Sequence, residues 1–266
     1  MHWHAYVLVF VAGLIAAFGT SLGAVPLFFV EDVDARLDVG LWGLAGGLMA
    51  SASVFGLLYE AYKHDSSVWL TGAGFVLGIV LVVGAHRIVE RMEYEPEDMA
   101  EADASTLLNI FVVLLVHSFP EGIAIGVSFA ELNGNSGVHW LGFTIPLLAF
   151  VMTGALAIHN VPEGIATAIP MREHMRNLKM WAAAFFTSVP QPIGAVVAFY
   201  FVVLAREFLG FGYGFAAGAM LYLVADDVLP EGLDAGEDIS DRRAKAWLAG
   251  GTTLGLVAMA PLVFFL

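Results

Sequence analysis

The sequence predicts an all-α membrane protein with eight transmembrane helices, built as one polytopic domain over residues 1–266. Of its 266 residues, 59% are hydrophobic and 14% are charged, and the mean hydropathy is +0.80. A soluble protein of this length carries about 25% charged residues. Apolar runs of about 20 residues, enough to cross a bilayer, recur along the whole chain. No segment between them is long enough to fold as a separate soluble domain.

Eight stretches are long and apolar enough to be spans, and charged, Gly, Asn or Pro residues separate them. They are residues 5–30, 41–62, 68–90, 105–131, 140–170, 178–206, 210–230 and 246–266. Lipid satisfies no backbone hydrogen bonds, so a spanning segment is a helix or a strand of a closed barrel. The sequence lacks the alternating segments of about ten residues that barrels show. We therefore expect each of the eight spans to be a helix.

The basic residues predict the orientation of these spans. Nine of the eleven Lys and Arg residues fall in the loops after spans 1, 3, 5 and 7: Arg36, Arg87, Arg91, Arg172, Arg176, Lys179, Arg242, Arg243 and Lys245. Lys63 and Arg206 are the two on the other side. Cytoplasmic loops carry an excess of Lys and Arg. The expected topology therefore has both termini outside the cytoplasm.

The overall charge and the absence of cysteine narrow the classes of function. The formal net charge is −14, with seven acidic residues between positions 90 and 103. Nucleic-acid binding needs a basic surface, so the sign of the charge argues against a nucleic-acid partner. The acidic stretch is either a solvated linker or an antechamber that concentrates cations. Because the chain has no cysteine, disulfides and thiolate metal ligands are excluded.

Two copies of one short pattern lie inside the predicted spans. HSFPEG at 117–122 and HNVPEG at 159–164 each place a histidine four residues before a glutamate. The surrounding segments 114–124 and 156–166 share seven of eleven residues at an offset of 42. An ionised side chain at the centre of a bilayer costs roughly 2.5–3.5 kcal/mol on insertion scales. A repeated pattern that carries this cost indicates a function within the membrane.

The spacing within each copy suits a metal ion. His117 and Glu121 lie about 6 Å apart along one helical face, as do His159 and Glu163. Two imidazoles and two carboxylates match Zn²⁺, Fe²⁺, Mn²⁺ or Cd²⁺ better than thiolate-preferring Cu⁺. The four side chains alone would complete a tetrahedral zinc site. The alternative for these residues is a structural role, in which they only hydrogen-bond between helices.

The doublet resembles the fourth and fifth spans of the ZIP (Zrt/Irt-like) family of divalent metal transporters. Segments 44–60 and 216–231 are similar to that family's second and seventh spans. The resemblance implies an inverted repeat, with spans 1–3 related to spans 6–8 around the central pair of spans 4 and 5. It also implies a multi-pass protein of the plasma membrane with extracytoplasmic termini. Members of the family often dimerise, so a homodimer is one assembly open to this chain.

The resemblance assigns the primary transport site to His117, Glu121, His159 and Glu163. Some prokaryotic members hold a second metal beside it, and the corresponding positions here are Ser118, Asn160 and Gln191. All three are neutral, whereas the two-metal version has carboxylates at the last two positions. Two cations about 4 Å apart repel strongly at low dielectric unless negative charge surrounds them. We therefore expect one well-occupied metal site and a weak second site.

Four further residues are candidates for the ion pathway. The resemblance makes Asp226 and Asp227, at the end of span 7, ligands of the exit path, with Asp226 the preferred one; a solvated helix end is the alternative. His86 closes span 3 and is either a cytoplasmic relay or an interfacial packing residue. Glu60, near the outer end of span 2, is a candidate entrance carboxylate.

The function implied by these features is transport of Zn²⁺, or of Fe²⁺, Mn²⁺ or Cd²⁺, into the cytoplasm. The ion is then the transported substrate, the bilayer the surrounding partner, and the protein is not an enzyme. An intramembrane metalloenzyme would need an open coordination position and a base near a bound water. A metal sensor that binds without translocating is the other alternative, although the sequence offers no soluble output domain.

Overall fold

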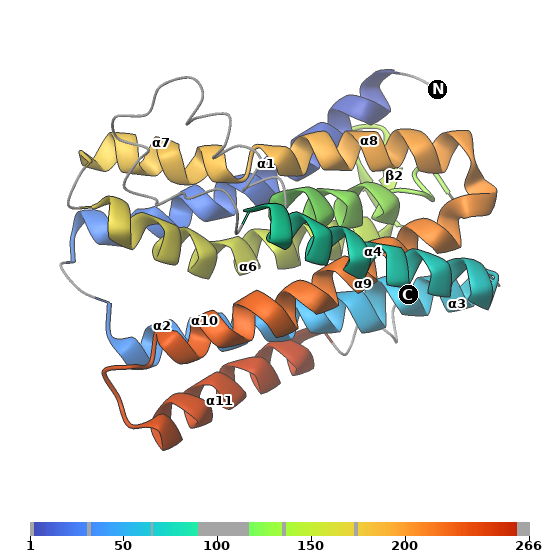
Figure 1. Cartoon of the computed structure of the whole chain (residues 1–266). Helices are drawn as coiled ribbons and strands as arrows, with labels where there is room; N and C mark the ends of the chain where they lie inside the picture. Colours follow the sequence, from blue (N-terminus) through green and yellow to red (C-terminus); the bar gives the residue numbers. More distant parts are fainter. Residues whose placement is uncertain are drawn as a thin grey trace.

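The computed structural model describes residues 3–30, 33–64, 66–89, 117–134, 137–172 and 175–259, and it is largely helical (Figure 1). Within these ranges, six helical segments are long and apolar enough to cross a membrane. They are Trp3–Phe28, Ala35–Lys63, Val68–Arg87, Leu147–Ile169, Asn177–Leu204 and Arg206–Asp234. The chain is therefore an α-helical, multi-pass membrane protein.

The N-terminal third contains three of these segments. Their elements are α1 (Trp3–Ala24) with the 3-10 turn η1 (Pro26–Phe28), then α2 (Ala35–Ser51), the π-helix η2 (Ala52–Leu58) and α3 (Tyr59–Lys63), and finally α4 (Val68–Val89). The second helix begins at Ala35, six residues before the predicted span, because Asp34 caps it. Its side chain accepts a hydrogen bond of 2.8 Å from the backbone N–H of Arg36.

The C-terminal half contains the remaining segments. Its elements are α6 (Leu147–Met171), α7 (Asn177–Thr187), α8 (Pro190–Leu204), η4 (Arg206–Phe208), α9 (Leu209–Leu223), the π-helix η5 (Val224–Val228), α10 (Leu229–Asp234) and α11 (Asp241–Met259). The predicted sixth span is interrupted at Ser188 and Val189. Pro190 and Pro192 follow directly, and proline both removes a backbone donor and restricts the residue before it.

The predicted fifth span is partly wrong, because its first seven residues do not form a helix. Strands β1 (Val138–Trp140) and β2 (Phe143–Ile145) pair antiparallel instead. Leu141 (φ 47°) and Gly142 (φ 82°) form the two-residue turn, with the positive φ values that such turns require. The helix α6 begins only after Pro146.

Two other predicted spans extend beyond the described residues. Residues 117–128 are helical, as expected for the end of span 4, whereas 105–116 lie outside the described ranges. The last helix begins at Asp241, five residues before the predicted span 8, and 260–266 again lie outside.

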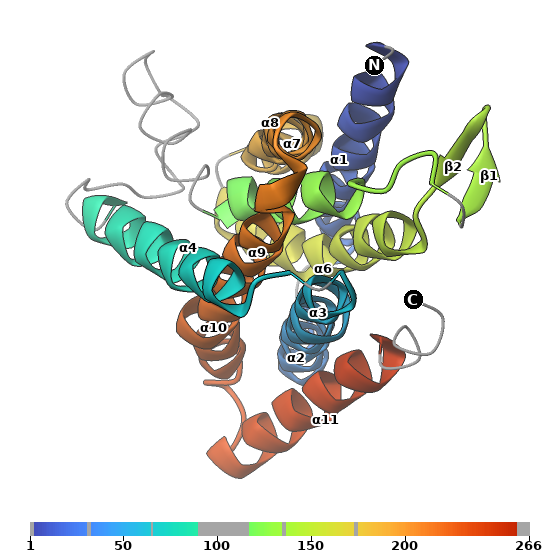
Figure 2. The same cartoon turned by 90° about the vertical axis from the view of Figure 1, so that its right-hand side faces the viewer.

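The described helices pack as two bundles. In the first, α1 contacts α6, α7 and α8, and the helix 117–128 packs on α8. In the second, α2 packs along α11 and α4 packs along α9. The views in Figures 1 and 2 agree on this division, and α2 and α6 provide the main contact between the two bundles.

Close helix contacts fix the two motif helices in the first bundle. A Cβ atom at Gly164 of α6 would collide with the backbone carbonyl of Thr20 in α1. One at Gly122 would collide with the carbonyl of Gln191 in α8. Small residues at such crossings let membrane helices approach backbone to backbone. The glycine after each motif glutamate thus sets how closely its helix lies against a neighbour.

Candidate metal centre

The two motif helices bring three of the four predicted ligands together. Ligand atoms of Glu121, His159 and Glu163 lie within 4.8 Å of one another. The contact is crosswise, since His159 Nε2 lies 3.2 Å from Glu121 Oε1 on the other helix. Such a crossing is expected of antiparallel helices, because the histidine of one copy then lies level with the glutamate of the other. We refer to Glu121, His159 and Glu163 as the core cluster.

The core cluster is buried and has a polar atom without a partner. Glu121 and His159 are each 3% exposed. Among the described residues, Glu163 Oε2 is buried and accepts no hydrogen bond. A buried polar atom without a partner is costly and rare in proteins. A set of one imidazole and two carboxylates with a spare coordinating atom suits a borderline divalent cation such as Zn²⁺.

The fourth motif ligand, His117, belongs to a second cluster with His86 and Asp227. Asp227 Oδ2 lies 3.1 Å from His117 Nε2 and 3.4 Å from His86 Nε2. Asp226 contacts His86, with Oδ2 3.1 Å from Nδ1, and also hydrogen-bonds Tyr222. Asp227 is therefore the residue that joins the motif helix to α4, whereas Asp226 was the preferred candidate from the sequence.

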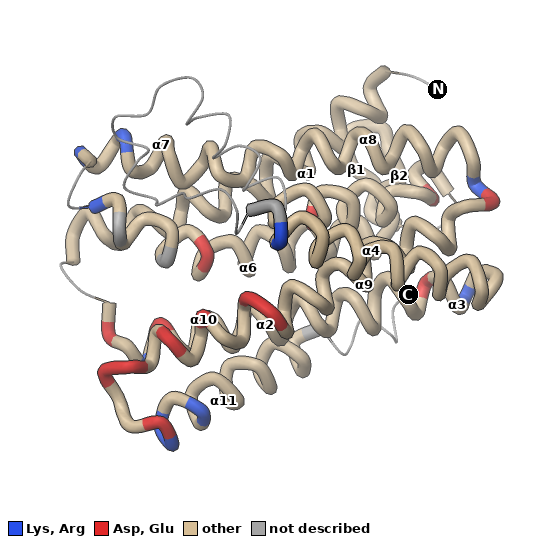
Figure 3. The backbone as a smooth tube through the Cα atoms, in the orientation of Figure 1, with Lys and Arg blue, Asp and Glu red and all other residues tan. Residues whose placement is uncertain are grey.

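The second cluster adjoins the core cluster. His117 precedes Glu121 by one helical turn, about 6 Å along the axis. Asp227 lies in the π-helix η5, and such π-helical turns often occur at functional sites. Acidic residues gather over α10 and the turn after it (Figure 3). A cation leaving the core cluster past His117 would therefore meet further ligands and a region of negative charge.

The three neutral residues at the position of a second metal are all buried and bonded to one another or to the backbone. Asn160 donates to the Ala16 carbonyl at 2.9 Å and to Gln191 Oε1 at 3.1 Å. The Gln191 amide in turn donates to Glu121 Oε2. Ser118 Oγ donates to the Thr187 carbonyl at 3.0 Å. The Gln191 N–H group thus uses a lone pair of Glu121 Oε2, whereas Asn160 Oδ1 is buried without a hydrogen-bond partner among the described residues.

Glu60, the candidate entrance residue, lies far from both clusters. It is in α3, and its Oε1 lies 3.1 Å from Nε2 of His64, one turn later on the same helix. His64 was not a candidate from the sequence. The spacing EAYKH, with glutamate and histidine four residues apart as in the motifs but in reverse order, is the signal that could have identified it.

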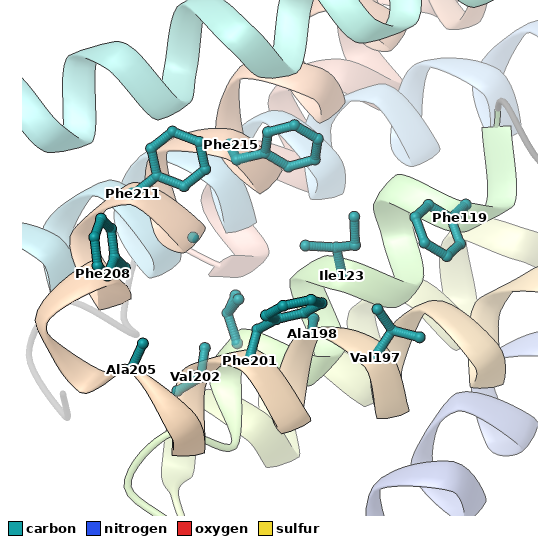
Figure 4. A pocket seen from close by; sticks show the side chains of 12 residues that line it. Phe119, Ile123, Val197, Ala198, Phe201, Val202, Ala205, Phe208, Phe211 and Phe215 are labelled. Carbon is teal, nitrogen blue, oxygen red and sulfur yellow. The ribbon is translucent and has the colours of Figure 1, made fainter.

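An apolar cavity of about 400 Å³ lies between the helix 117–128, α8 and α9 (Figure 4). Its lining includes Phe119, Phe201, Phe211 and Phe215, and every residue that lines it is apolar. With no side chain that ligates a metal, this cavity is not part of the candidate centre.

A family model described as ZIP zinc transporter matches residues 91–262, which include both motifs and the second cluster apart from His86. The chain belongs to the ZIP zinc transporter family. This membership agrees with the resemblance seen in the sequence.

The relatives of known name include bacterial proteins of similar length. The chain is 28% identical to the zinc transporter GufA of Myxococcus xanthus, covering 93% of this chain and 96% of that protein. It is 29% identical to the zinc transporter ZupT of Corynebacterium efficiens, covering 99% and 100%. A protein of Arabidopsis thaliana, named as a candidate zinc transporter, is 36% identical over 82% of this chain, which spans only 33% of that longer protein.

Proposed function

We propose that this protein transports Zn²⁺, or a similar divalent cation such as Fe²⁺, Mn²⁺ or Cd²⁺, from outside the cell into the cytoplasm. The observation that carries the proposal is the convergence of Glu121, His159 and Glu163 within the membrane-spanning bundle. The two carboxylates offset the charge of the cation, and the imidazole favours borderline metals over Mg²⁺ and Ca²⁺. Membership of a family of zinc transporters supports the same assignment.

The proposed route runs from the core cluster to the second cluster. His117 is the link, because it lies one turn from Glu121 and its imidazole already contacts Asp227. A cation that exchanges Glu121 and Glu163 for His117, Asp227 and then His86 keeps at least one protein ligand at each step. A transport site must release its ion, so it should bind the ion with moderate affinity. Neighbouring sites that share ligands let the ion pass from one site to the next, which favours transport over storage.

We propose that the core cluster holds one cation at a time. A second metal beside the first would need added negative charge to offset repulsion at low dielectric. Asn160 and Gln191 provide amides at that position and are fully buried. Gln191 Oε1 accepts from Asn160 and the Gln191 amide donates to Glu121 Oε2, so these two oxygens already use lone pairs that a second cation would need.

The proposed topology has eight spans with an inverted repeat and both termini outside the cytoplasm, in the plasma membrane. The helix contacts support the repeat. If spans 1–3 correspond to spans 6–8, the contact of α2 with α11 corresponds to that of α9 with α4, and both are extensive. In the same way the contact of α1 with α6 corresponds to that of α8 with the helix 117–128. The excess of basic residues in the four loops after spans 1, 3, 5 and 7 supports the proposed orientation, with those loops in the cytoplasm.

The test is uptake of ⁶⁵Zn²⁺ into proteoliposomes that contain the purified chain. Glu163→Gln keeps the shape of the side chain and removes its charge, so we expect the initial rate to fall at least tenfold, in line with the loss of a charged ligand. Asp241→Asn is the matched control, because Asp241 has a side chain 77% exposed at the start of α11 and should leave uptake unchanged. Uptake by Glu163→Gln at the rate of the unchanged chain would refute the proposal.

A further inference from the structure

Glu60 and His64 lie together at the end of the second span, where they offer a carboxylate and an imidazole. His64 Nε2 lies 3.1 Å from Glu60 Oε1. The carboxylate is mostly buried, with 14% of its side chain exposed, whereas the imidazole is 35% exposed. The pair is therefore reached from solvent through the histidine, with the glutamate behind it.

The separation of the two ligand atoms fits a shared cation. Zinc–nitrogen and zinc–oxygen bonds are about 2.0–2.2 Å long, so two ligands of one ion at angles near 90–110° lie roughly 3.0–3.5 Å apart. His64 Nε2 and Glu60 Oε1 are 3.1 Å apart, a hydrogen-bond distance that also falls within this range. The pair could close on an ion with little movement of either side chain.

Glu60 also carries an atom that the protein leaves without a partner. Its second oxygen, Oε2, is buried and has no hydrogen-bond partner among the described residues. Glu60 and Glu131 both act electrostatically on Tyr213 of α9, so a second carboxylate lies at the same end of the bundle. Glu131 is itself paired with Arg206 at 3.8 Å, so the case for a cation rests on the unpartnered oxygen of Glu60 beside the imidazole of His64.

The pair is too far from the core cluster to share its ion. His159 of the core cluster lies against Ala45 of α2. Glu60 follows Ala45 by 15 residues along continuous helix, which is roughly 20 Å at 1.5 Å per residue. Gly56, one turn before Glu60, packs against Leu148 and Met152 of α6, so the same helical face leads from the pair toward the motif helix.

We propose that Glu60 and His64 form a capture site, which binds Zn²⁺ or a similar divalent cation on the extracytoplasmic face before it reaches the core cluster. The assignment of this face rests on the proposed function and its topology. Two protein ligands leave the remaining coordination positions to water, so the capture site binds weakly and exchanges its ion rapidly. Its effect is to raise the local concentration of the cation at the start of the route.

Counting zinc ions on the purified, full-length chain tests the capture site. Glu121→Gln with Glu163→Gln removes the charges of the core cluster, and equilibrium dialysis then measures the Zn²⁺ that remains bound. Adding His64→Gln to this double variant should remove one further equivalent. Adding His139→Gln, which changes an exposed histidine of β1, should remove none. In the chain with His64→Gln alone, the half-saturating Zn²⁺ concentration for uptake should rise about threefold to tenfold.

A second measurement does not depend on the folding of any variant. Diethylpyrocarbonate modifies accessible histidines, and mass spectrometry of the unchanged protein should show that Zn²⁺ protects His64 but not His139. Equal modification of His64 with and without Zn²⁺, or an unchanged zinc count after His64→Gln, would overturn the capture site and leave the proposed function intact. A wild-type chain that neither binds nor transports Zn²⁺ would overturn both.

Discussion

The hydrogen bond from the Gln191 amide to Glu121 should control the zinc affinity of the core cluster. Gln191→Leu keeps the approximate volume of a fully buried side chain and removes the donor. Asn160 loses Gln191 Oε1 as an acceptor but keeps its bond to the Ala16 carbonyl. Among the ligands of the core cluster, Glu121 is the one that loses a hydrogen-bond donor.

The expected magnitude follows from the partners involved. A hydrogen bond to a charged group contributes about 1.5–3 kcal/mol, and each 1.36 kcal/mol corresponds to a factor of ten in an equilibrium constant. Gln191→Leu should thus weaken Zn²⁺ binding by about 10-fold to 100-fold. This range agrees with the usual effect of changing a residue that supports a metal ligand.

The assay is a competition titration of the purified protein against a zinc chelator of known affinity. Thr187→Val is the matched control, since Thr187 is buried one turn before Gln191 and its hydroxyl bonds only the Ala184 carbonyl. This control should bind zinc like the unchanged chain. If Gln191→Leu also binds zinc as tightly as the unchanged chain, the role given to the amide is refuted.

Three further predictions concern the same region. Gln191→Glu adds the charge that a second cation needs, so bound zinc in the core cluster should rise from one ion to two, as counted by elemental analysis. Gly164→Ala should destabilise the protein by about 1–3 kcal/mol through its clash with Thr20, seen as a lower Tm. Gly154→Ala on the same helix, with nothing within 4 Å of the added atom, should not lower it. Acidification should weaken zinc binding because protons compete for His159 and the carboxylates, so a titration showing tighter binding at lower pH would contradict the assigned ligands.

Much of the candidate site could be predicted because its ligands repeat within a hydrophobic sequence. The two motifs identify Glu121, His159 and Glu163, and the structure brings these residues together. The antiparallel order of two neighbouring spans also implies the crosswise contact between His159 and Glu121. Because helix geometry is regular, metal ligands at a fixed spacing within one helix can be predicted from the sequence.

The partners of His117 and Glu60 could not be predicted in the same way. His117 pairs with Asp227, which is distant in sequence, and only the packing of α9 against α4 and the motif helix brings it close. His64 was missed because its single, reversed spacing has no second copy to distinguish it from an ordinary helix end. Contacts between helices depend on which faces pack, and a single sequence does not record that choice.

The differences in the fold have local causes. The hairpin before α6 turns at Leu141 and Gly142, which both have positive φ, and the helix begins only after Pro146. The helix α2 begins before the predicted span because Asp34 caps it. The sequence contains this capping residue, but the charged residues around it predicted a loop at this position. Hydropathy locates the apolar part of a span, whereas caps and turns decide where its helix begins.

The most direct test of the account is the position of zinc in a crystal of the protein grown with Zn²⁺, located by anomalous scattering at the zinc absorption edge. We predict a strong peak within bonding distance of Glu121, His159 and Glu163. A structure with zinc elsewhere and these three side chains bonded only to protein atoms would contradict it.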